Sequence, residues 1–442
     1  MRWRGSARRG CCVERGNAAL SGVLGGLVVV IWGILLFARG GWWRMGERDS
    51  GMPAAPAAWP SVVAVVPARD EATVVGRAIA SLAAQDYPGE FRIILVDDAS
   101  SDETAEVARR AYAASAHSPH AGATSAPLPF RGGAGGGEYA ARSALISNDC
   151  PTPDPSKGEG RFVVLPASPL APGWTGKLAA VSQGIAAAGE PAYLWLTDAD
   201  ITHAPDTLRS LVARAVGERR VLVSLMARLR CDSVAERFLV PAFVWFFAML
   251  FPFRAIARPG KVAAAAGGVM LVDRAALERA GGIVAIRGSL IDDCALAKVM
   301  KAQGPIALLL TDRSVSLRAY PRIGDIGAMI SRSAYAQLDY SPPLLAGTLV
   351  GLALTFVAPP LLTFFGSDAG RVGGALAWGM MSAAFQPMLR FYRRSPVWGL
   401  AVPAIALVYG WYTLVSALQT WRGAGGQWKG RAQALPTSRA NA

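Results

Sequence analysis

The chain has 442 residues, which is enough for one large catalytic domain and further elements. Apolar residues make up 52% of it and charged residues only 17%, whereas about a quarter of the residues in a soluble domain are charged. This composition argues against an ordinary soluble enzyme. Its net charge is +14, carried mainly by arginine and without a nucleic-acid recognition motif, so we expect contact with lipid headgroups or phosphorylated small molecules.

The cysteine residues fit neither a disulfide framework nor a zinc site. Their number is odd and no two have the CxxC spacing. We therefore expect a catalytic domain in a reducing, cytoplasmic environment. The five residues are Cys11, Cys12, Cys150, Cys231 and Cys294.

Residues 18–37 form an uncharged run that is long enough to cross about 30 Å of hydrocarbon as a helix. The run leads into Arg39, Trp42 and Trp43, which resemble the basic and aromatic border of a membrane span. Because a signal peptide has a shorter apolar core and a small-residue cleavage site, we interpret residues 1–50 as a tail with a retained anchor.

Three further apolar stretches, at 344–365, 372–389 and 397–418, predict a C-terminal membrane bundle over 344–420 with a tail at 421–442. Arg390, Arg393 and Arg394 between the last two favour a cytoplasmic loop, hence a multi-pass protein of the inner membrane with a cytoplasmic catalytic domain. Four crossings would, however, place the arginine-rich N-terminal residues and the tail outside, against the same rule.

The first half of the region between the anchor and the bundle, 61–340, alternates β-branched runs with helical patterns, which is typical of βαβ units and a parallel sheet. Within it, residues 113–160 are rich in Gly, Ala, Ser and Pro, and we expect a disordered insertion there. The aromatic run at 238–253 is consistent with an interfacial helix or a buried core segment, and the two arginines that follow it favour the interfacial helix.

Acidic residues follow three of the predicted strands. Ligands of open parallel sheets bind beyond the carboxyl ends of the strands, so these residues are candidates for a binding site. Asp102, farther along the second loop, is expected to be an N-cap of the next helix instead. The candidates are Asp70 and Glu71 after the first strand, Asp97 and Asp98 after the second, and Asp198 and Asp200 after a later one.

The third pair has the Asp-x-Asp spacing, which brings two carboxylates close to one point. Such a pair suits a hard divalent cation, Mg²⁺ or Mn²⁺, that neutralises a diphosphate leaving group. An acidic pair at a strand end is by itself also typical of a solvated turn. His203, three residues after Asp200, is expected to be a satisfied polar residue rather than a ligand.

Taken in order, four motifs give a more specific signal: PARDE at 67–71, VDDASSDET at 96–104, GWTGKLAA at 173–180 and TDAD at 197–200. This order resembles a family 2 glycosyltransferase with the GT-A fold. The resemblance implies an α/β, Rossmann-like domain that binds a nucleotide-sugar, with UDP as the default nucleotide, here with one N-terminal and about three C-terminal transmembrane helices.

The resemblance also implies roles for particular residues. Asp70 and one or both of Asp97 and Asp98 would hold the nucleotide. Asp198 and Asp200 would address the metal and the diphosphate, and Lys177 in the GK element would face the donor phosphates.

Two later motifs complete the implied site. LIDDCALA at 290–297 resembles the family's "ED" element, so Asp293 would be the catalytic base and Asp292 its support or an N-cap. Membrane-bound members carry a Q/R-x-x-R-W element, and residues 329–333 retain only its arginine, Arg332. Arg332 would neutralise diphosphate charge, or alternatively bind lipid as a juxtamembrane arginine.

AGGVMLVDRAALERAGG at 266–282 and RSAYAQL at 332–338 resemble the hopene-associated glycosyltransferase group. This favours an inverting enzyme that glycosylates a hopanoid or polyprenyl lipid. The alternatives are a processive polysaccharide synthase, which would be expected to keep the tryptophan after Arg332, and an inactive membrane scaffold.

Overall fold

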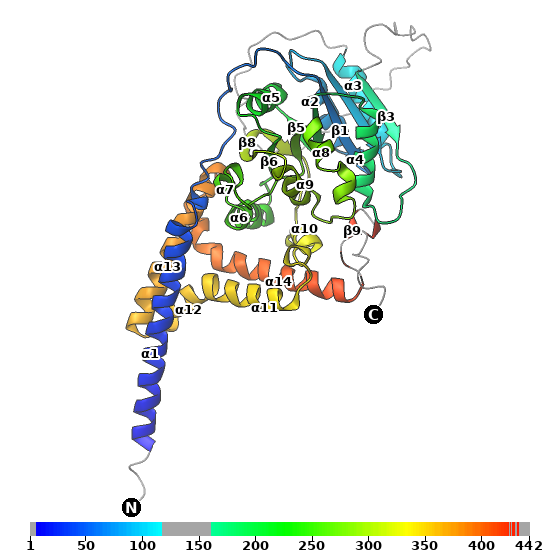
Figure 1. Ribbon diagram of the computed structural model, residues 1–442. Helices are drawn as coiled ribbons and strands as arrows, with labels where there is room; N and C mark the ends of the chain where they lie inside the picture. The colour runs from blue at the N-terminus through cyan, green and yellow to red at the C-terminus, as the bar shows by residue number, and fades with distance from the viewer. Residues whose placement is uncertain (1–5, 117–160, 424, 426, 429–430, 433–442) are drawn as a thin grey trace, which may run out of the picture.

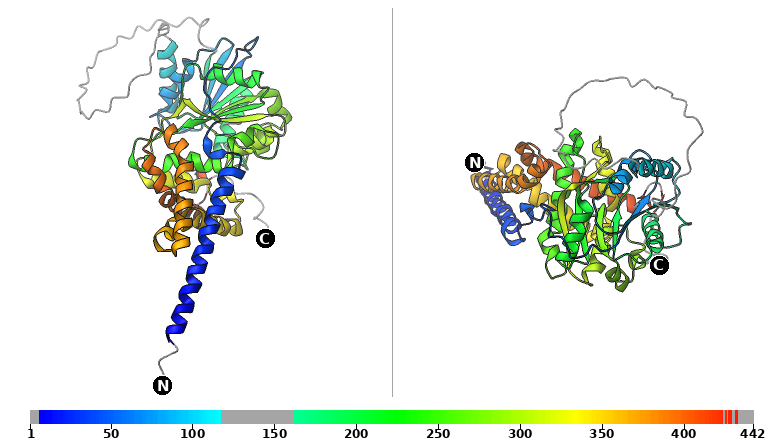
Figure 2. Two further views of the ribbon diagram at one scale, coloured as in Figure 1. Left: turned by 90° about the vertical axis from the view of Figure 1, so that its left-hand side faces the viewer. Right: turned by 90° about the horizontal axis from the view of Figure 1, so that it is seen from above.

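The computed structural model describes residues 6–116, 161–423, 425, 427–428 and 431–432. An α/β domain lies at one end of the molecule, and helix α1 (Ser6–Gly33) projects away from it (Figures 1 and 2). Most of the predicted insertion, from 117 to 160, and the two other histidines, His117 and His120, lie outside the described residues.

The domain is built on an eight-stranded sheet with the order β3-β2-β1-β4-β7-β6-β8-β5. The first four of these strands are mutually parallel and alternate with helices along the chain, as the sequence predicts. These elements are β1 (Val62–Ala68), α2 (Val75–Ala83), β2 (Phe91–Asp97), α3 (Thr104–Ala116), β3 (Phe162–Pro166), α4 (Gly176–Ala187) and β4 (Tyr193–Thr197).

The other half of the sheet departs from the parallel arrangement that was predicted from the first half of the region. Strand β7 runs antiparallel to both of its neighbours, β4 and β6, and β5 runs antiparallel to β8. Hydrophobic periodicity carries no information on strand direction, so the sequence could not show this. The elements are β5 (Ile201–His203), α5 (Thr207–Gly217), β6 (Leu222–Arg228), β7 (Val269–Asp273), α8 (Arg274–Arg279), η3 (Ile283–Ile286), α9 (Asp292–Lys301) and β8 (Ile306–Ser316).

Strand β1 is buried along its whole length because it separates the two halves of the core. Val63 and Val65 belong to one hydrophobic cluster, and Val62 belongs to the other, on the opposite face of the sheet. Helix α4 packs closely on this strand at Gly184, where an added Cβ would lie 2.4 Å from Val65 Cγ1. This close approach brings the start of α4 to the edge of the sheet that carries the acidic motifs.

Helix α6 (Val234–Leu250) is a buried element, so the preference for an interfacial helix at 238–253 is wrong. Its N-terminus is fixed by a capping box between Ser233 and Glu236. Trp245, which is fully buried, packs against Trp42 with ring centroids 5.0 Å apart and against Phe385 at 5.2 Å. A uniformly apolar helix becomes a core segment here because helices from both ends of the chain cover it.

Among the residues that the structure describes, three segments are long and apolar enough to cross a membrane: Gly16–Ala38, Pro342–Phe365 and Pro396–Trp421. They match three of the four predicted spans. The fourth, 372–389, lies in α13, a helix of 24 residues that packs against α1 and is not among these three segments. Around these segments lie η1 (Ile34–Ala38), η2 (Trp42–Arg44), α7 (Phe253–Ala257), α10 (Ile323–Ser333), η4 (Ala336–Leu338), α11 (Pro342–Leu352), η5 (Ala353–Val357), α12 (Ala358–Phe365), α13 (Asp368–Phe391), η6 (Pro396–Ala401), α14 (Val402–Trp421), β9 (Gln427–Trp428) and β10 (Arg431–Ala432).

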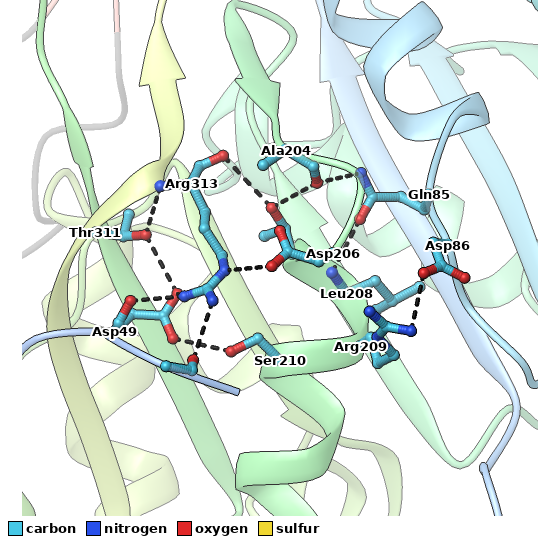
Figure 3. Close-up of polar contacts among 12 residues, drawn as sticks. Asp49, Gln85, Asp86, Ala204, Asp206, Leu208, Arg209, Ser210, Thr311 and Arg313 are labelled. Atoms are coloured by element: carbon cyan, nitrogen blue, oxygen red, sulfur yellow. Dashed lines mark hydrogen bonds and ion pairs between the residues drawn. The ribbon is translucent and has the colours of Figure 1, made fainter. Parts of the chain in front are cut away.

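The segment that follows the predicted anchor contacts the α/β domain through the side chain of Asp49 (Figure 3). The buried Asp49 carboxylate accepts a hydrogen bond from Ser210 Oγ at 2.9 Å and forms an ion pair with Arg313 Nη1 at 3.1 Å. Its backbone N–H donates to the carbonyl of Leu310 in β8. A buried carboxylate without partners would be strongly unfavourable, so this cluster holds the anchor segment in a defined position on the domain.

Candidate active site

The loops after β1 and β2 are joined by side-chain hydrogen bonds. Asp70 has a φ of 49°, in the left-handed region. Its carboxylate accepts two hydrogen bonds from Ser101, one from the Ser101 backbone N–H at 2.7 Å and one from the Ser101 hydroxyl at 3.0 Å. The hydrogen bond from the Ser101 backbone lowers the pKa of Asp70. Asp97 accepts from the backbone N–H of Ser100 at 3.1 Å. The two predicted nucleotide-binding loops therefore form one structural unit.

Arg69 lies between the carboxylates of this unit, although no motif in the sequence predicts a role for it. Its Nε is 3.8 Å from Asp70 Oδ2, and its Nη1 is 3.8 Å from Oδ2 of the buried Asp98. Asp102, next in the loop, accepts from the backbone N–H of Thr104 and of Ala72. Because α3 begins at Thr104, Asp102 lies one residue before the N-cap position, and its carboxylate accepts from the first helical N–H rather than occupying the predicted N-cap position.

The Asp-x-Asp carboxylates follow β4, and each faces a cation. Arg318 Nε lies 2.7 Å from Asp200 Oδ2, and Arg318 Nη2 lies 2.6 Å from Glu71 Oε1. Burial alone would lower the pKa of Arg318, but the charges of Asp200 and Glu71 outweigh it and hold the pKa above its ordinary value. This guanidinium therefore connects the loop after β1, which carries Glu71, with the loop after β4, which carries Asp200.

The sequence does not identify Arg318, because it is far from both of its partners along the chain. Strand β8 places it: the strand is parallel to β6, and Leu317, just after β8, donates its backbone N–H to Asp200 O at 2.8 Å. The available signal was its position directly after a long apolar strand, the same signal that marked the acidic residues.

Lys177 connects the Asp-x-Asp motif after β4 with the motif that contains the predicted base. Its Nζ lies 2.9 Å from Asp198 Oδ1 and 3.1 Å from Asp292 Oδ2. Thr175 caps α4 by accepting from the Leu178 backbone N–H, which fixes the turn that carries the lysine. Although burial opposes it, the attraction of Asp198 and Asp292 raises the pKa of Lys177, so the ammonium stays charged.

Asp293 lies close to this lysine, next to a small pocket whose lining includes its neighbour Asp292. Its Oδ2 accepts from the Gly267 backbone N–H at 3.0 Å, and its Oδ1 accepts from the Cys294 backbone N–H at 2.7 Å. Burial, followed by the charge of Asp292, raises the pKa of Asp293 to about 6. The pocket is lined by Pro67, Lys177, Thr197, Asp198, Gly267 and Asp292, among others.

Helix α9 begins at Asp292, so Asp292 is its first helical residue and not the N-cap, which is Ile291. Its carboxylate instead supports Lys177. Gly267 faces the same pocket, and a Cβ there would lie 3.3 Å from Lys177 Nζ and 3.4 Å from Asp293 Oδ2. A side chain at position 267 would therefore crowd the two groups that the motifs single out.

Arg332 and His203 occupy other positions. Within the part of the chain that the structure describes, exposed Arg332 on α10 makes no hydrogen bond or ion pair to these carboxylates. His203 is buried, with Nε2 3.1 Å from Thr197 Oγ1 and Nδ1 3.0 Å from Ser314 Oγ, and burial lowers its pKa to about 3. Its ring nitrogens are thus both occupied, as expected for a satisfied polar residue.

The donor set for a divalent cation consists of Asp198 and Asp200. No group of three or more His, Cys, Asp or Glu side chains suited to a metal gathers among the described residues. Two carboxylates are, however, what Mg²⁺ usually takes from a protein when substrate phosphates and waters supply its other ligands. Burial raises the pKa of Asp198, with Lys177 acting against it and Asp200 with it, so another cation at this point would be favourable. The residues fit the implied metal.

Comparison with known families places this site in a wider group. The profile of glycosyl transferase family 21 matches residues 163–434, more than half of the chain, and that of glycosyl transferase family 2 matches residues 63–120. The chain belongs to glycosyl transferase family 21. This glycosyltransferase therefore has an α/β domain of the expected GT-A class, with the acidic residues described above in the loops after its strands.

Several solved structures are similar to this family 21 chain. The mannosyltransferase PcManGT of Pyrobaculum calidifontis, in complex with GDP-Man and Mn²⁺, is 18% identical, with a TM-score of 0.49 over 91% of this chain and 99% of that one. The glucosyl-3-phosphoglycerate synthase of M. tuberculosis is 17% identical, with a TM-score of 0.37 over 63% and 80%. TarS of S. aureus is 12% identical, with a TM-score of 0.36 over 82% and 54%. No curated protein sequence matches the chain.

Proposed function

We propose that this protein is a membrane-bound, inverting glycosyltransferase that moves a sugar from a nucleotide-sugar, a UDP-sugar in the first instance, to a lipid acceptor. The observation that carries the proposal is the position of Lys177. Its ammonium touches Asp198 on the donor side and Asp292 on the acceptor side, next to Asp293. A cation shared between these carboxylates is suited to a diphosphate leaving group beside a base.

On the donor side, Asp70, Asp97 and Asp98 would accept hydrogen bonds from the base and ribose, with Arg69 holding their loops together. Asp198 and Asp200 would hold Mg²⁺ or Mn²⁺, which neutralises the diphosphate as it leaves. Three basic side chains from different parts of the chain would face the donor phosphates. They are Lys177, Arg318 and Arg332. Arg332 would reach the phosphates only if helix α10 or the arginine side chain moves toward the donor.

Asp293 would act as the base in a single displacement. The acceptor hydroxyl attacks the anomeric carbon from the face opposite the diphosphate, and its proton passes to the Asp293 carboxylate as the carbon–diphosphate bond breaks. A pKa of about 6 suits this role, because the group is ionised at neutral pH and still basic enough to accept a proton. The Gly267 and Cys294 N–H groups would orient the carboxylate.

A lipid acceptor is supported by what lies next to the site. Helix α10, which follows Arg318 and carries Arg332, packs on α14, one of the helices that are apolar enough to cross a membrane. An acceptor head held in a bilayer would therefore approach the pocket from the α10 side. A hopanoid or polyprenyl lipid is the class favoured by the motifs at 266–282 and 332–338.

The arginines at the end of α13 support a location in the inner membrane with the catalytic domain in the cytoplasm. Arg390, Arg393 and Arg394 lie where α13 meets the catalytic domain, and Phe391 beside them stacks under Arg48 and Arg228. Positively charged residues beside apolar helices favour the cytoplasmic face.

The test is transfer by purified, detergent-solubilised protein from radiolabelled UDP-, GDP- and dTDP-sugars to hopanoid or polyprenyl phosphate acceptors, with Asp293→Asn as control. Label that enters the organic phase only with the wild type supports the proposal. Label that enters a water-soluble polymer would favour a polysaccharide synthase, and absence of transfer with every pair would contradict the proposed acceptor class.

A further inference from the structure

We propose that helix α14 lies in the plane of the membrane beneath the catalytic domain and does not cross it, so that the chain after Trp421 is on the same side as the active site. This inference requires membrane association but not the proposed reaction. In Figure 1, α14 and its neighbour α11 run across the direction of α1.

The beginning and middle of this segment contact α6 of the catalytic domain. The ring of Trp398, in η6 just before α14, packs on Phe238 with centroids 6.0 Å apart. Tyr409, near the middle of α14, donates its hydroxyl to Leu239 O at 3.0 Å. Both contacts are therefore made to the first half of the same buried helix.

The end of α14 contacts the catalytic domain too. Ser416 Oγ accepts the Tyr335 backbone N–H at 3.0 Å, and Trp421 Nε1 donates to Tyr335 Oη at 3.3 Å. Between these points Tyr412 fills the space beside Gly327 of α10, where an added Cβ would lie 2.0 Å from the tyrosine ring. The segment is therefore in contact with the catalytic domain at its start, its middle and its end.

The length of the segment makes these contacts incompatible with a crossing. From Trp398 to Trp421 a helix extends about 35 Å, slightly more than the hydrocarbon core of about 30 Å. If α14 crossed, parts of the catalytic domain would lie at both membrane faces. Helix α10 would then carry Arg322, Asp325 and Arg332 through the hydrocarbon, which is strongly unfavourable.

The outward face of the segment is apolar along its length. No charged residue occurs between Arg394 and Arg422, and the exposed large side chains recur at intervals close to multiples of 3.6 residues. A helix with one face covered by protein and an apolar stripe on the other suits the acyl chains of a single leaflet. The stripe consists of Val397 (70% exposed), Leu400 (55%), Leu407 (57%), Trp411 (58%) and Trp421 (54%).

This placement removes one conflict in the topology that the sequence predicted. With four crossings, Arg422 and the basic tail would lie outside. With α14 in the plane, Arg422 lies on the catalytic side together with Arg393 and Arg394, as the preference of basic residues for the cytoplasmic face requires. Leu345 of α11 shares a cluster with Ala417 of α14, so the start of α11 lies at the same level.

The depth of nitroxide spin labels tests this directly. Single cysteines at Val397, Leu407 and Trp421 would be labelled in the full-length chain, with its native cysteines replaced and its donor binding retained, and reconstituted in phosphatidylglycerol-containing vesicles. Leu20 and Val30 on α1 and Phe37 on η1 are the matched controls, because their side chains are also exposed and apolar. We expect the three α14 depths to agree within about 5 Å, whereas Leu20 and Phe37 differ by about 25 Å along the membrane normal. Leu407 at the bilayer centre, with Val397 and Trp421 at opposite interfaces, would overturn the proposal.

A labelling experiment gives an independent answer. In sealed vesicles, a membrane-impermeant maleimide should label Arg422→Cys from the same side as Glu106→Cys, an exposed position on α3 of the catalytic domain. Labelling of the two positions from opposite sides would contradict an in-plane α14. Neither outcome depends on which sugar or acceptor the enzyme uses, so the failure of this proposal is distinguishable from the failure of the proposed function.

Discussion

Lys177 Nζ lies 3.1 Å from Asp292 Oδ2, which ties the first turn of α4 to the first turn of α9 across the mouth of the pocket. These two helices carry the GK element and the predicted base motif, and more than a hundred residues separate them in the chain. The contact makes the charge of the donor side dependent on the element that presents Asp293. The activity of the enzyme should therefore respond to changes at either end of this ion pair.

Substitution Asp293→Asn should lower kcat by about 10²- to 10⁴-fold, because a general base typically contributes that much and the amide cannot accept the proton. Donor affinity should change little, since the donor carboxylates remain. Kinetics and nucleotide-sugar binding would be measured together. The matched control is Asp312→Asn, an exposed carboxylate paired with Arg228, which should leave both quantities unchanged. Unchanged transfer by Asp293→Asn would remove this residue from the mechanism.

The pH dependence of transfer should show the ionisation of the same group. The pKa of Asp293 is raised to about 6, and the base acts only in its deprotonated form. Activity should therefore be full at neutral pH and fall about tenfold per pH unit below pH 6, rather than below pH 4 as for an ordinary aspartate. A kcat profile that is flat down to pH 4.5 would contradict the assignment of Asp293 as a buried base.

Arg318→Gln should weaken donor binding by about tenfold or more, because it removes a charge-assisted contact and leaves Glu71 and Asp200 facing each other without their cation. Isothermal titration with the donor and Mn²⁺ would measure the effect. Arg230→Gln is the control, an exposed arginine that pairs with Asp232. Equal affinities for the two variants would show that Arg318 has no part in donor binding.

Trp245→Ala should destabilise the junction between the catalytic domain and the membrane helices. The side chain is fully buried and packs against rings from four other segments, so its loss should cost about 3–5 kcal/mol of the free energy of unfolding. Thermal unfolding in detergent would report a lower Tm. Trp411→Ala removes the same side chain from an exposed position and should change Tm little; similar losses in both variants would argue against a structural role for the buried cluster.

The sequence predicted the parts of the molecule that local patterns determine. The strands that end at Ala68, Asp97 and Thr197 lie where alternation and β-branching indicated, and their acidic residues meet at one edge of the sheet. Lys177 and Asp293 lie close to them because their motifs fix the turns that carry them. The direction of β7 was not predictable, since the same apolar run suits either direction in a sheet.

The remaining differences come from tertiary contacts. Arg318 has no local motif, and only the pairing of β8 brings it to Asp200. The apolar run of α6 has the composition of a membrane-facing helix, but helices from both ends of the chain cover it. Helix α14 has the composition of a membrane span, although it packs on the catalytic domain along its length. Composition reports the polarity of the surroundings of a helix but not its orientation.

We propose that Asp198 and Asp200 together hold a nucleotide-sugar through a divalent cation. Binding of UDP-, GDP- and dTDP-sugars to the solubilised protein with and without Mn²⁺, in the wild type and in Asp200→Asn, tests it most directly. We predict that one donor binds only with Mn²⁺ and that the substitution weakens this binding by about tenfold or more, the effect of losing one ligand charge. Binding that is indifferent to both Mn²⁺ and Asp200→Asn, or no binding of any donor by folded protein, would contradict it.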